Sequence, residues 1–342
     1  MGPGRAPAIV GLEVAALALL LVLPALLSDF HVFFMTRTLM FVLLALGFDL
    51  TWGYGGIFSL GQAVFFGAGA YVAGLLATRQ DITSVFVTIP AATLAGLVLS
   101  LLLAGFLFLG RRRVSVIYIS LATLAASYAF ERLAAAWTEI GAANGIPSVP
   151  VLTAGDTRLL PGQTFYYLAL LVVVLVYLLF RSVVGSQFGL ALVAGRTDLQ
   201  RVTYLGYHTA GAQLLVFGLA GAVSGMAGGF YAFHEGFVSP SLLGVMLSTQ
   251  VVLWALFGGV GTLIGAVVGV IAIEAVGLQL ADRLPEYWPI ILGAILLVGI
   301  TFLPNGILGL VVPDRARVMR FGRGGTTEPG PGEADAHGEA VA

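Results

Sequence analysis

The sequence predicts an all-α, polytopic membrane protein of about ten transmembrane helices, with both termini in the cytoplasm. Hydrophobic residues make up 59% of the 342 residues, charged residues make up 10%, and the mean hydropathy is +1.01. No soluble domain core can bury so much apolar surface. The apolar residues gather in runs of about the 20 residues that a helix needs to cross a membrane. The basic residues, finally, are distributed unevenly between these runs.

Polar, Gly or Pro residues separate the candidate spans. In chain order the spans are predicted at 8–27, 31–52, 57–78, 84–109, 114–136, 164–180, 211–233, 243–258, 261–280 and 286–303. We take the first as a retained span and not as a cleaved signal peptide, because Glu13 interrupts its start and no small-residue cleavage site follows. Residues 1–312 are therefore expected to form one transmembrane domain. The Gly-, Pro- and acid-rich tail at 313–342 is expected to be cytoplasmic and disordered.

The arginines predict the orientation. All 16 basic residues are Arg, so the rule that cytoplasmic loops carry the positive charge becomes an arginine count. With ten spans and a cytoplasmic N-terminus, one side carries eleven arginines and the other carries only Arg79, Arg158 and Arg283. This asymmetry places both termini and the loop at about 181–210 in the cytoplasm.

Missing residue types exclude several chemistries. The chain has no Cys, which excludes disulfides, thiolate metal sites and cysteine nucleophiles. Its four His are scattered along the sequence, so we predict no metal site. It has no Lys, and therefore no phosphate-binding GxxxxGK[ST] loop. If ATP powers this protein, a separate subunit must bind it. No set of nucleophile, base and metal predicts an enzyme, and we expect no nucleic-acid partner.

Glycine is unusually frequent inside the predicted spans. Of the 46 Gly, many fall in 53–74 and 218–229. Small residues allow membrane helices to approach closely, which is one explanation for both stretches. The other is that a helix breaks or starts late at Gly53 to Gly56, where irregular backbone is tolerated if it lines a cavity. A weaker copy of 55–67 at 258–269 hints at an internal repeat, a common plan in transporters.

Four residues in the first glycine-rich stretch are candidates for a translocation pathway. Ser59 and Gln62 are its only strongly polar side chains, and their spacing of three would place them on one helix face. Phe65 and Phe66 add an aromatic surface nearby. Such a set would serve a solute with polar and apolar portions. The alternative is that Ser59 and Gln62 hydrogen-bond a neighbouring helix.

Ionisable side chains inside predicted spans are candidates for function. They are Arg37, Asp49, Glu131, Arg132 and Glu274, of which only Glu274 is predicted to lie deep in the membrane. No row of acidic residues or His follows one helix, as a proton relay would require. This weakens the case for an ion-coupled carrier, for which Glu274 is the one candidate site.

A polar segment between two apolar runs, GRTDLQRVTYLG at 195–206, is the candidate coupling element. It predicts a short amphipathic helix with Leu199, Val202 and Leu205 on one apolar face. Such a helix could enter a groove on a soluble partner or could rest on lipid head groups. Its candidate contact residues are Gly195, Arg196, Asp198, Leu199, Arg201 and Gly206.

From about residue 38 to 312, the chain resembles the permease subunits of LIV-type ABC importers, which carry branched-chain amino acids. The matching blocks are LGFDLTWGYGGIFSLGQAVFFGAGAYVAG (46–74), YISLATLA (118–125), FGLALVAGRTDLQRVTYLGY (188–207), FGLAGAVSGMAGGFYA (217–232), FVSP (237–240), VVLWALFGGVGTLIGAVVG (251–269) and FLPNGILGL (302–310). The resemblance implies a second, similar permease subunit, two cytoplasmic ATPases that bind the ATP, and an extracytoplasmic solute-binding protein. It also implies the bacterial cytoplasmic (inner) membrane, and it makes 195–206 the segment that meets the ATPase.

The chain departs from the family pattern at three places. The family has an acidic residue where Leu199 stands and a Lys where Gln213 stands. Before the NGI at 144–146 the family has TGG, whereas this chain has Ile140, Gly141 and two alanines. Arg196, Arg201 and Gly206 are retained. The departures put the detailed ATPase contact and the solute in doubt, while the docking role stays.

The resemblance implies alternating access driven from the cytoplasm. A loaded binding protein would dock on the outer loops at 137–163 and 234–242, and ATP-driven closure of the ATPases would push on 195–206. Branched-chain amino acids are the expected solutes, and similar permeases carry urea and short amides. The competing class is a stand-alone channel or ion-coupled carrier with the same spans.

Overall fold

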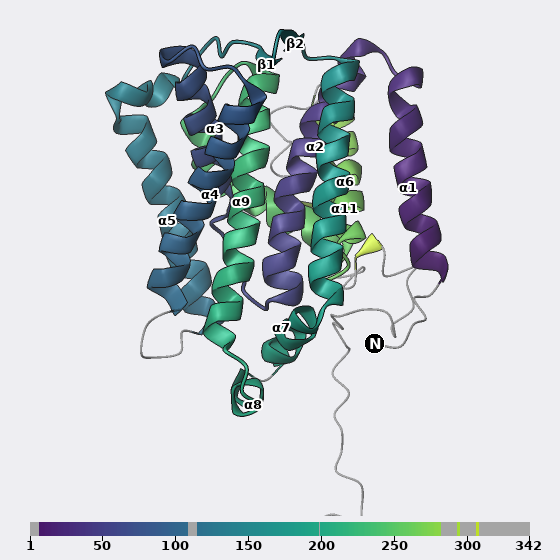
Figure 1. Cartoon of the computed structure of the whole chain (residues 1–342), viewed down its shortest axis with the longest axis vertical. Helices are drawn as coiled ribbons and strands as arrows, with labels where there is room; N and C mark the ends of the chain where they lie inside the picture. Colours follow the sequence, from purple (N-terminus) through teal and green to yellow (C-terminus); the bar gives the residue numbers. More distant parts are fainter. Residues whose placement is uncertain (1–6, 109–114, 198, 282–292, 295–305, 308–342) are drawn as a thin grey trace, which may run out of the picture.

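A computed structural model describes residues 7–108, 115–197, 199–281, 293–294 and 306–307. Within these residues the chain is a helical bundle with one short β-hairpin (Figure 1). The α-helices are α1 (Pro7–Leu26), α2 (Asp29–Asp49), α3 (Gln62–Arg79), α4 (Val85–Phe108), α5 (Val116–Ala136), α6 (Gln163–Gly185), α7 (Gln187–Thr197), α8 (Leu199–Tyr204), α9 (Thr209–Glu235), α10 (Val245–Gly258) and α11 (Ile264–Ala281). Short elements are the π-helical turn η1 (Leu50–Tyr54), the 3-10 turns η2 (Thr138–Ile140), η3 (Ala142–Asn144) and η4 (Pro240–Leu243), and the strands β1 (Leu152–Ala154) and β2 (Thr157–Leu159).

Five of the described helices are long and apolar enough to cross a membrane, namely α2 with η1, α4, α5, α6 and α9. The chain is therefore an all-α, multi-pass membrane protein. Nine of the ten predicted spans coincide with a described helix, and of the tenth, 286–303, only residues 293–294 are described. Two boundaries were wrong, because the third span begins at Gln62 instead of 57 and the sixth continues to Gly185. The total of ten spans stays a prediction, as does the tail at 313–342.

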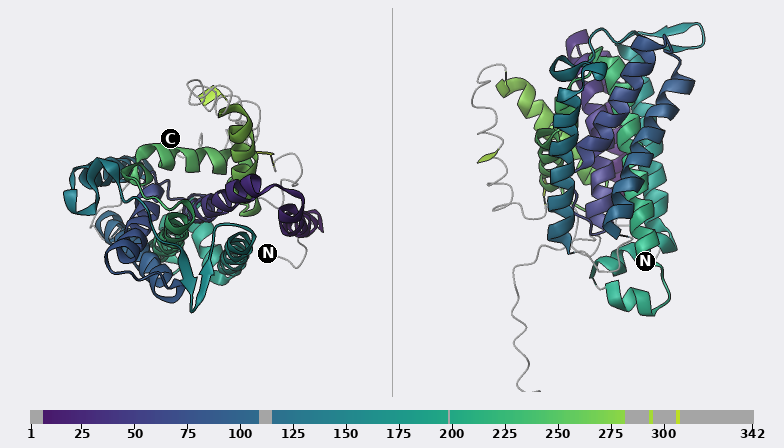
Figure 2. Two further views of the ribbon diagram at one scale, coloured as in Figure 1. Left: turned by 90° about the horizontal axis from the view of Figure 1, so that it is seen from above. Right: turned by 90° about the vertical axis from the view of Figure 1, so that its left-hand side faces the viewer.

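Helix α9 lies at the centre of the bundle and packs against α2, α3 and α4 (Figures 1 and 2). Glycine makes this packing possible. A Cβ added at Gly228 would lie 1.8 Å from the carbonyl oxygen of Phe66, and one at Gly69 would lie 2.0 Å from that of Gly225. Distances this short exclude any side chain. The predicted role of the glycine-rich stretches in close helix packing is therefore confirmed.

The two ends of the bundle differ. The strands β1 and β2 pair in antiparallel register, Leu152 with Leu159, and cap one end, while α7 and α8 project from the other (Figures 1 and 2). The first turn of α1 points toward the α7–α8 end. We call the two ends the hairpin end and the α7–α8 end. The arginine count predicts that the α7–α8 end faces the cytoplasm.

Glu13 attaches α1 to α6. Its carboxylate accepts hydrogen bonds from the Tyr177 hydroxyl, at 2.7 Å, and from the Arg181 guanidinium. Nearer the hairpin end of the same helix pair, the Tyr166 hydroxyl donates to the carbonyl oxygen of Leu20 at 2.8 Å. The acidic residue that interrupts the first apolar run is thus paired within the fold, as buried charges must be.

Candidate functional site

The chain leaves the bundle through a tight bend between α6 and α7. The backbone N–H of Gly189 donates to the Ser186 hydroxyl at 3.3 Å, which gives α7 a side-chain acceptor at its first turn. A Cβ at Gly189 would lie 2.1 Å from the carbonyl oxygen of Val184, so only glycine fits this bend. The bend therefore fixes the direction in which α7 crosses the end of the bundle.

A glycine cap ends α8 and returns the chain to α9. Gly206 has a φ of +88°, its N–H donates to the Thr203 carbonyl, and the N–H of Tyr207 donates to the Val202 carbonyl. These two bonds form a Schellman motif, whose positive φ favours glycine. Nothing lies within 4 Å of the position that a Gly206 Cβ would occupy. The glycine is needed for its backbone conformation and not for space.

The predicted helix over 195–206 is described on both sides of residue 198, which itself lies outside the described residues. Gly195 and Arg196 belong to the last turn of α7, and Arg201 belongs to the six residues of α8. Val202 is 5% exposed, as predicted for the apolar face, but Leu205 follows the end of α8 and is 75% exposed. Arg201 is exposed. Asp198 and the side chain of Leu199 lie outside the described residues.

Arg196 points into the protein. Its guanidinium donates a hydrogen bond of 2.9 Å to the carbonyl oxygen of Gly53, in η1. Its side chain also covers Gly56, where a Cβ would lie 2.7 Å from the Arg196 Cγ. Burial lowers the pKa of Arg196, and the nearby charge of Asp49 partly offsets this effect. Arginine nevertheless stays charged in proteins, so a fixed cation of α7 contacts the end of the α2 span.

The Asp49 carboxylate joins the interruption after α2 to the one between α10 and α11 by accepting hydrogen bonds. Its carboxylate accepts from the backbone N–H of Gly261 at 2.6 Å and from that of Leu263 at 2.9 Å. Both donors lie in the loop between α10 and α11, and Asp49 is fully buried. A Cβ at Gly53 would lie 2.6 Å from the Asp49 Oδ1 and 2.7 Å from the Gly261 nitrogen. The absence of a side chain at Gly53 therefore allows the two loops to meet.

Both copies of the predicted repeat are interruptions between helices. After Gly55 and Gly56 the backbone is irregular until α3 begins at Gln62, and after 258–259 it is irregular until α11 begins at Ile264. Positive φ angles occur in both, +68° at Gly56 and +80° at 261. The predicted helix break at Gly53 to Gly56 is confirmed. It begins with a π-helical turn, a feature found often at functional sites.

Ser59 and Gln62 do not share a helix face, because α3 begins only at Gln62. Gln62 bridges two elements: its Nε2 donates to the Thr51 hydroxyl and its Oε1 accepts from the Ser224 hydroxyl, both at 3.3 Å. Ser59 accepts from the N–H of residue 61 at 3.2 Å. Both side chains are 1% exposed. Gln62 therefore makes the interhelical hydrogen bonds of the alternative interpretation.

Phe65 and Phe66 point into different parts of the core, and both are fully buried. Phe65 makes an edge contact with Phe217 at a centroid distance of 5.5 Å. Phe66 makes an edge contact with Tyr231 at 5.3 Å and lies 6.1 Å from Phe41. In this conformation neither ring faces an open passage.

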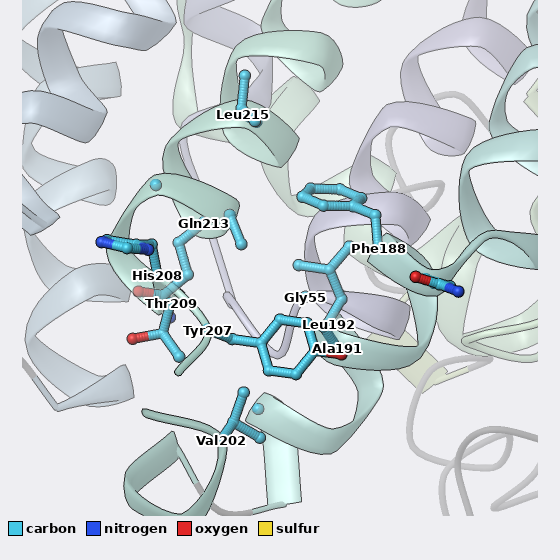
Figure 3. A pocket seen from close by; sticks show the side chains of 14 residues that line it. Gly55, Phe188, Ala191, Leu192, Val202, Tyr207, His208, Thr209, Gln213 and Leu215 are labelled. Atoms are coloured by element: carbon cyan, nitrogen blue, oxygen red, sulfur yellow. The ribbon is translucent and has the colours of Figure 1, made fainter. Parts of the chain in front are cut away.

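A cavity of about 450 Å³ lies between α7, α8 and the start of α9 (Figure 3). Phe188 and Leu192 of α7 face the segment that carries His208 and Gln213. Gly55 also lines the cavity, so the space extends from the α7–α8 end to the interrupted helix. Gln213 is one of the positions where the chain departs from the family pattern.

The sequence does not reveal the partners of Arg196 and Asp49. In the sequence, Asp49 is an ionisable residue inside a predicted span, and Gly53 is the first residue of the predicted helix break. The signal for Asp49 is that a buried acid without a nearby base must find backbone donors. Which donors it finds depends on a loop more than 200 residues further along the chain.

Comparisons with known proteins agree with the resemblance in the sequence. A family model described as branched-chain amino acid transport system / permease component matches residues 30–300. The chain is 27% identical over 324 residues to the high-affinity branched-chain amino acid transport system permease protein LivM of Salmonella typhimurium. It is 28% identical over 325 residues to LivM of Escherichia coli, and each match covers 88% of this chain and 75% of the relative.

A more distant match is the autoinducer 2 import system permease protein LsrC of Yersinia enterocolitica. It is 28% identical over 171 residues, which are 48% of this chain and 46% of that protein. No solved structure matches the chain significantly.

We expect Asp49→Asn to lower the apparent melting temperature of the purified protein. Asparagine keeps one acceptor oxygen but turns an NH₂ group toward a backbone N–H, which loses an acceptor at a cost of about 1–3 kcal/mol. Thermal unfolding in detergent measures the effect. Asp156→Asn, in the exposed turn between β1 and β2, is the matched control and should change nothing. Equal melting temperatures for the two variants would contradict the role of Asp49.

Proposed function

Because the chain belongs to the family of permease components of branched-chain amino acid transport systems, we propose that it is the transmembrane subunit of an ABC importer for leucine, isoleucine and valine. The chain carries the translocation pathway, and separate subunits bind and hydrolyse ATP. It performs no covalent chemistry and holds no cofactor of its own. Its similarity to LivM over most of both chains supports this assignment.

We propose that the complete transporter pairs this chain with a second, homologous permease. Two ATPases bind at the α7–α8 end and a solute-binding protein docks at the hairpin end, on 137–163 and 234–242. The complex lies in the bacterial cytoplasmic membrane, with ten spans and both termini in the cytoplasm. The arginine asymmetry supports the orientation, and the projection of α7 and α8 from the bundle supports the ATPase site.

The contact between Arg196 and Gly53 is the observation that carries the mechanism. An ATPase that moves α7 and α8 would move the Arg196 guanidinium, and with it the Gly53 carbonyl to which that group is bonded. Asp49 connects the same turn to the loop between α10 and α11. A displacement at the surface would thus reach both interrupted helices. Interrupted helices are where transporters of other folds place their solute sites.

The proposed pathway residues Ser59, Gln62, Phe65 and Phe66 are buried in this conformation. A pathway along them therefore requires the interrupted helix to move away from α9. Such a rearrangement is alternating access, in which the solute site opens to one side of the membrane at a time. The Arg196 contact lies at the start of this interrupted segment, where a push would be most effective.

A stand-alone channel or ion-coupled carrier is less well supported. Glu274, the candidate ion site of the sequence, lies 3.8 Å from the Arg37 guanidinium, and a cation this near disfavours a site for a metal cation or a proton-coupled acid. Such a protein would also leave α7, α8 and the Arg196 contact without a role. Urea or a short amide remains the alternative solute of the same importer.

The proposal is tested by purifying the tagged chain from its native membrane in mild detergent. We expect two ATPases and a second permease to copurify. Reconstituted in liposomes with the binding protein, the complex should take up leucine only with ATP, and unlabelled valine should compete whereas urea should not. A chain that purifies alone and moves solute without ATP would contradict the importer. Uptake of urea and not leucine would contradict the solute.

We expect two substitutions in the coupling segment to impair transport in different ways, one by preventing ATPase binding and the other by weakening the coupling of ATP hydrolysis to uptake. Arg201→Glu reverses an exposed charge on α8 and should prevent the ATPases from copurifying. Arg196→Gln should leave the ATPases bound, because the side chain points inward, but should lower leucine uptake per ATP hydrolysed severalfold. Arg132→Glu, exposed on α5 near the hairpin end, is the control. Normal solute-stimulated ATP hydrolysis in Arg201→Glu would refute the docking role.

We expect Gln62→Leu to impair uptake more than assembly. The Thr51 hydroxyl donates to the Phe48 carbonyl at 2.9 Å, and the single hydrogen of the Ser224 hydroxyl, which Gln62 shares, also has the Ala220 carbonyl as an acceptor at 2.8 Å. Losing the Gln62 bonds should therefore cost only about 1 kcal/mol. Leucine uptake and the yield of complex are compared with those of Gln80→Leu, an exposed position at the end of α3. If yield and uptake fell together, Gln62 would serve only to join helices.

A further inference from the structure

A group of charged and polar side chains lies between α2, α9 and α11, remote from the α7–α8 end. Arg37 comes from α2, Tyr231, His234 and Glu235 from α9, and Glu274 from α11. Arg37 lies within electrostatic range of all four other side chains. We call these five residues the Arg37 cluster. Neither the family assignment nor the coupling mechanism gives it a role.

The Arg37 cluster leaves polar atoms without partners. Arg37 and Glu274 are 3.8 Å apart, which is longer than a hydrogen bond. Among the residues that the structure describes, the buried atoms Arg37 Nε, Glu235 Oε1 and His234 Nδ1 have no hydrogen-bond partner. Buried polar atoms in native proteins rarely lack a hydrogen-bond partner. Three of them in one charged cluster point to a polar group that the chain does not itself supply.

The unpartnered atoms are of two kinds. Arg37 can only donate. Glu235 Oε1 can only accept when the acid is ionised, as can the carboxylate of the neighbouring Glu274. The His234 Nε2 lies 3.0 Å from the Phe33 carbonyl oxygen. Because a carbonyl only accepts, this nitrogen carries the hydrogen, and in the neutral ring Nδ1 is an acceptor. The cluster thus offers one cationic donor beside several acceptors.

The position of the cluster excludes a lipid-facing role. Arg37 is eight residues from the start of α2, or about 12 Å along the helix axis. Its side chain is nevertheless 33% exposed, and that of Glu274 is 16% exposed. Charged side chains at membrane depth face a bundle interior or a water-filled cavity, because exposure to lipid tails is costly. The open side of the cluster therefore faces water or protein and not lipid tails.

Aromatic rings surround the charges. Arg37 lies over the Phe34 ring, 4.8 Å from its centroid. His234 stacks on Phe33 at 4.1 Å, and Tyr231 lies 5.8 Å from Phe41. A ligand bound here meets a cation, acids and an apolar wall within a short distance. A branched-chain amino acid carries the complement of each: a carboxylate, an ammonium group and an apolar side chain.

We infer that the Arg37 cluster is a binding station for a zwitterionic α-amino acid on its way from the hairpin end into the pathway. The guanidinium of Arg37 binds the carboxylate, and Glu235, with Glu274, binds the ammonium group. The inference rests on the proposed function, which it deepens by placing the solute. The same pairing of cation and anion occurs in an ethanolamine lipid head group, so the test must separate the two.

The test uses the whole complex, without binding protein, in nanodiscs of phosphatidylcholine alone. Saturation-transfer NMR detects weak binding of leucine to it. We expect a leucine signal with the native chain and its loss with Arg37→Gln and with Glu235→Gln, which is nearly isosteric. Arg132→Gln and the exposed Asp81→Asn are matched controls and should keep the signal. Analogues that lack one charge, 4-methylpentanoate and isopentylamine, should compete at least tenfold more weakly than isoleucine.

Assembly and basal ATP hydrolysis, measured on every variant, separate binding from folding. If the complex with Arg37→Gln fails to assemble, the inference is tested instead with Glu235→Gln and with competition by 4-methylpentanoate and isopentylamine. A merely structural ion pair predicts that the neutral double variant Arg37→Gln with Glu274→Gln regains the leucine signal, whereas a binding station predicts that it does not. Regained signal would overturn the inference. So would loss of the leucine signal when ethanolamine lipid is added to the nanodiscs, since a head group would then occupy the cluster.

Leucine uptake by the native complex separates this inference from the proposed function. A native complex that hydrolyses ATP but takes up no leucine would overturn the proposed function, and the inference with it. A native complex that takes up leucine, with signal and uptake unchanged in Arg37→Gln and Glu235→Gln, would overturn the inference alone.

Discussion

The buried carboxylate of Asp49 holds together two helix interruptions that are more than 200 residues apart in the sequence. Interrupted helices expose backbone N–H and C=O groups that cannot be left unpaired in a membrane. Asp49 satisfies two of the N–H groups in the loop before α11, and Arg196 satisfies one carbonyl in η1. The irregular backbone is therefore stable only while both charged side chains stay in place. Since Arg196 belongs to α7, a movement of α7 relative to the bundle acts directly on this junction.

Glycine and these charges have complementary roles. Along α3, α4 and α9 the glycines bring backbones so close that no side chain fits, as at Gly69 and Gly228, and these helices pack as one unit. At the interruption the missing side chain of Gly53 instead makes room for the Asp49 carboxylate. The same residue type thus supports a closely packed body in one place and an irregular hinge in another. The cavity beside Gly55 borders that hinge and leaves space beside α7.

The two charged regions of the molecule differ in how completely they are paired. Where the two helix interruptions meet, the Arg196 guanidinium and the Asp49 carboxylate each make hydrogen bonds to backbone groups. Among the described residues, the ion pair of the Arg37 cluster is 3.8 Å apart and three of the buried polar atoms of the cluster lack hydrogen-bond partners. Full pairing is what a mechanical connection requires, because it must transmit displacement. Incomplete pairing is what a solute site requires, because the solute completes it.

The sequence by itself determined the class of the protein, its family, the positions of nine described helices to within a few residues, and the break at Gly53 to Gly56. The class, the helices and the break follow from local composition, namely apolar length and glycine density, whereas the family follows from the resemblance of whole sequence blocks. Only the tertiary structure decided that Arg196 turns inward, that Asp49 reaches Gly261, and that Gln62 joins Thr51 to Ser224. These contacts join segments between 11 and 212 residues apart. Side-chain periodicity describes one helix at a time, so it cannot identify partners on another. It also failed at Ser59 and Leu205, since both lie beyond a helix end, where the helical period no longer applies.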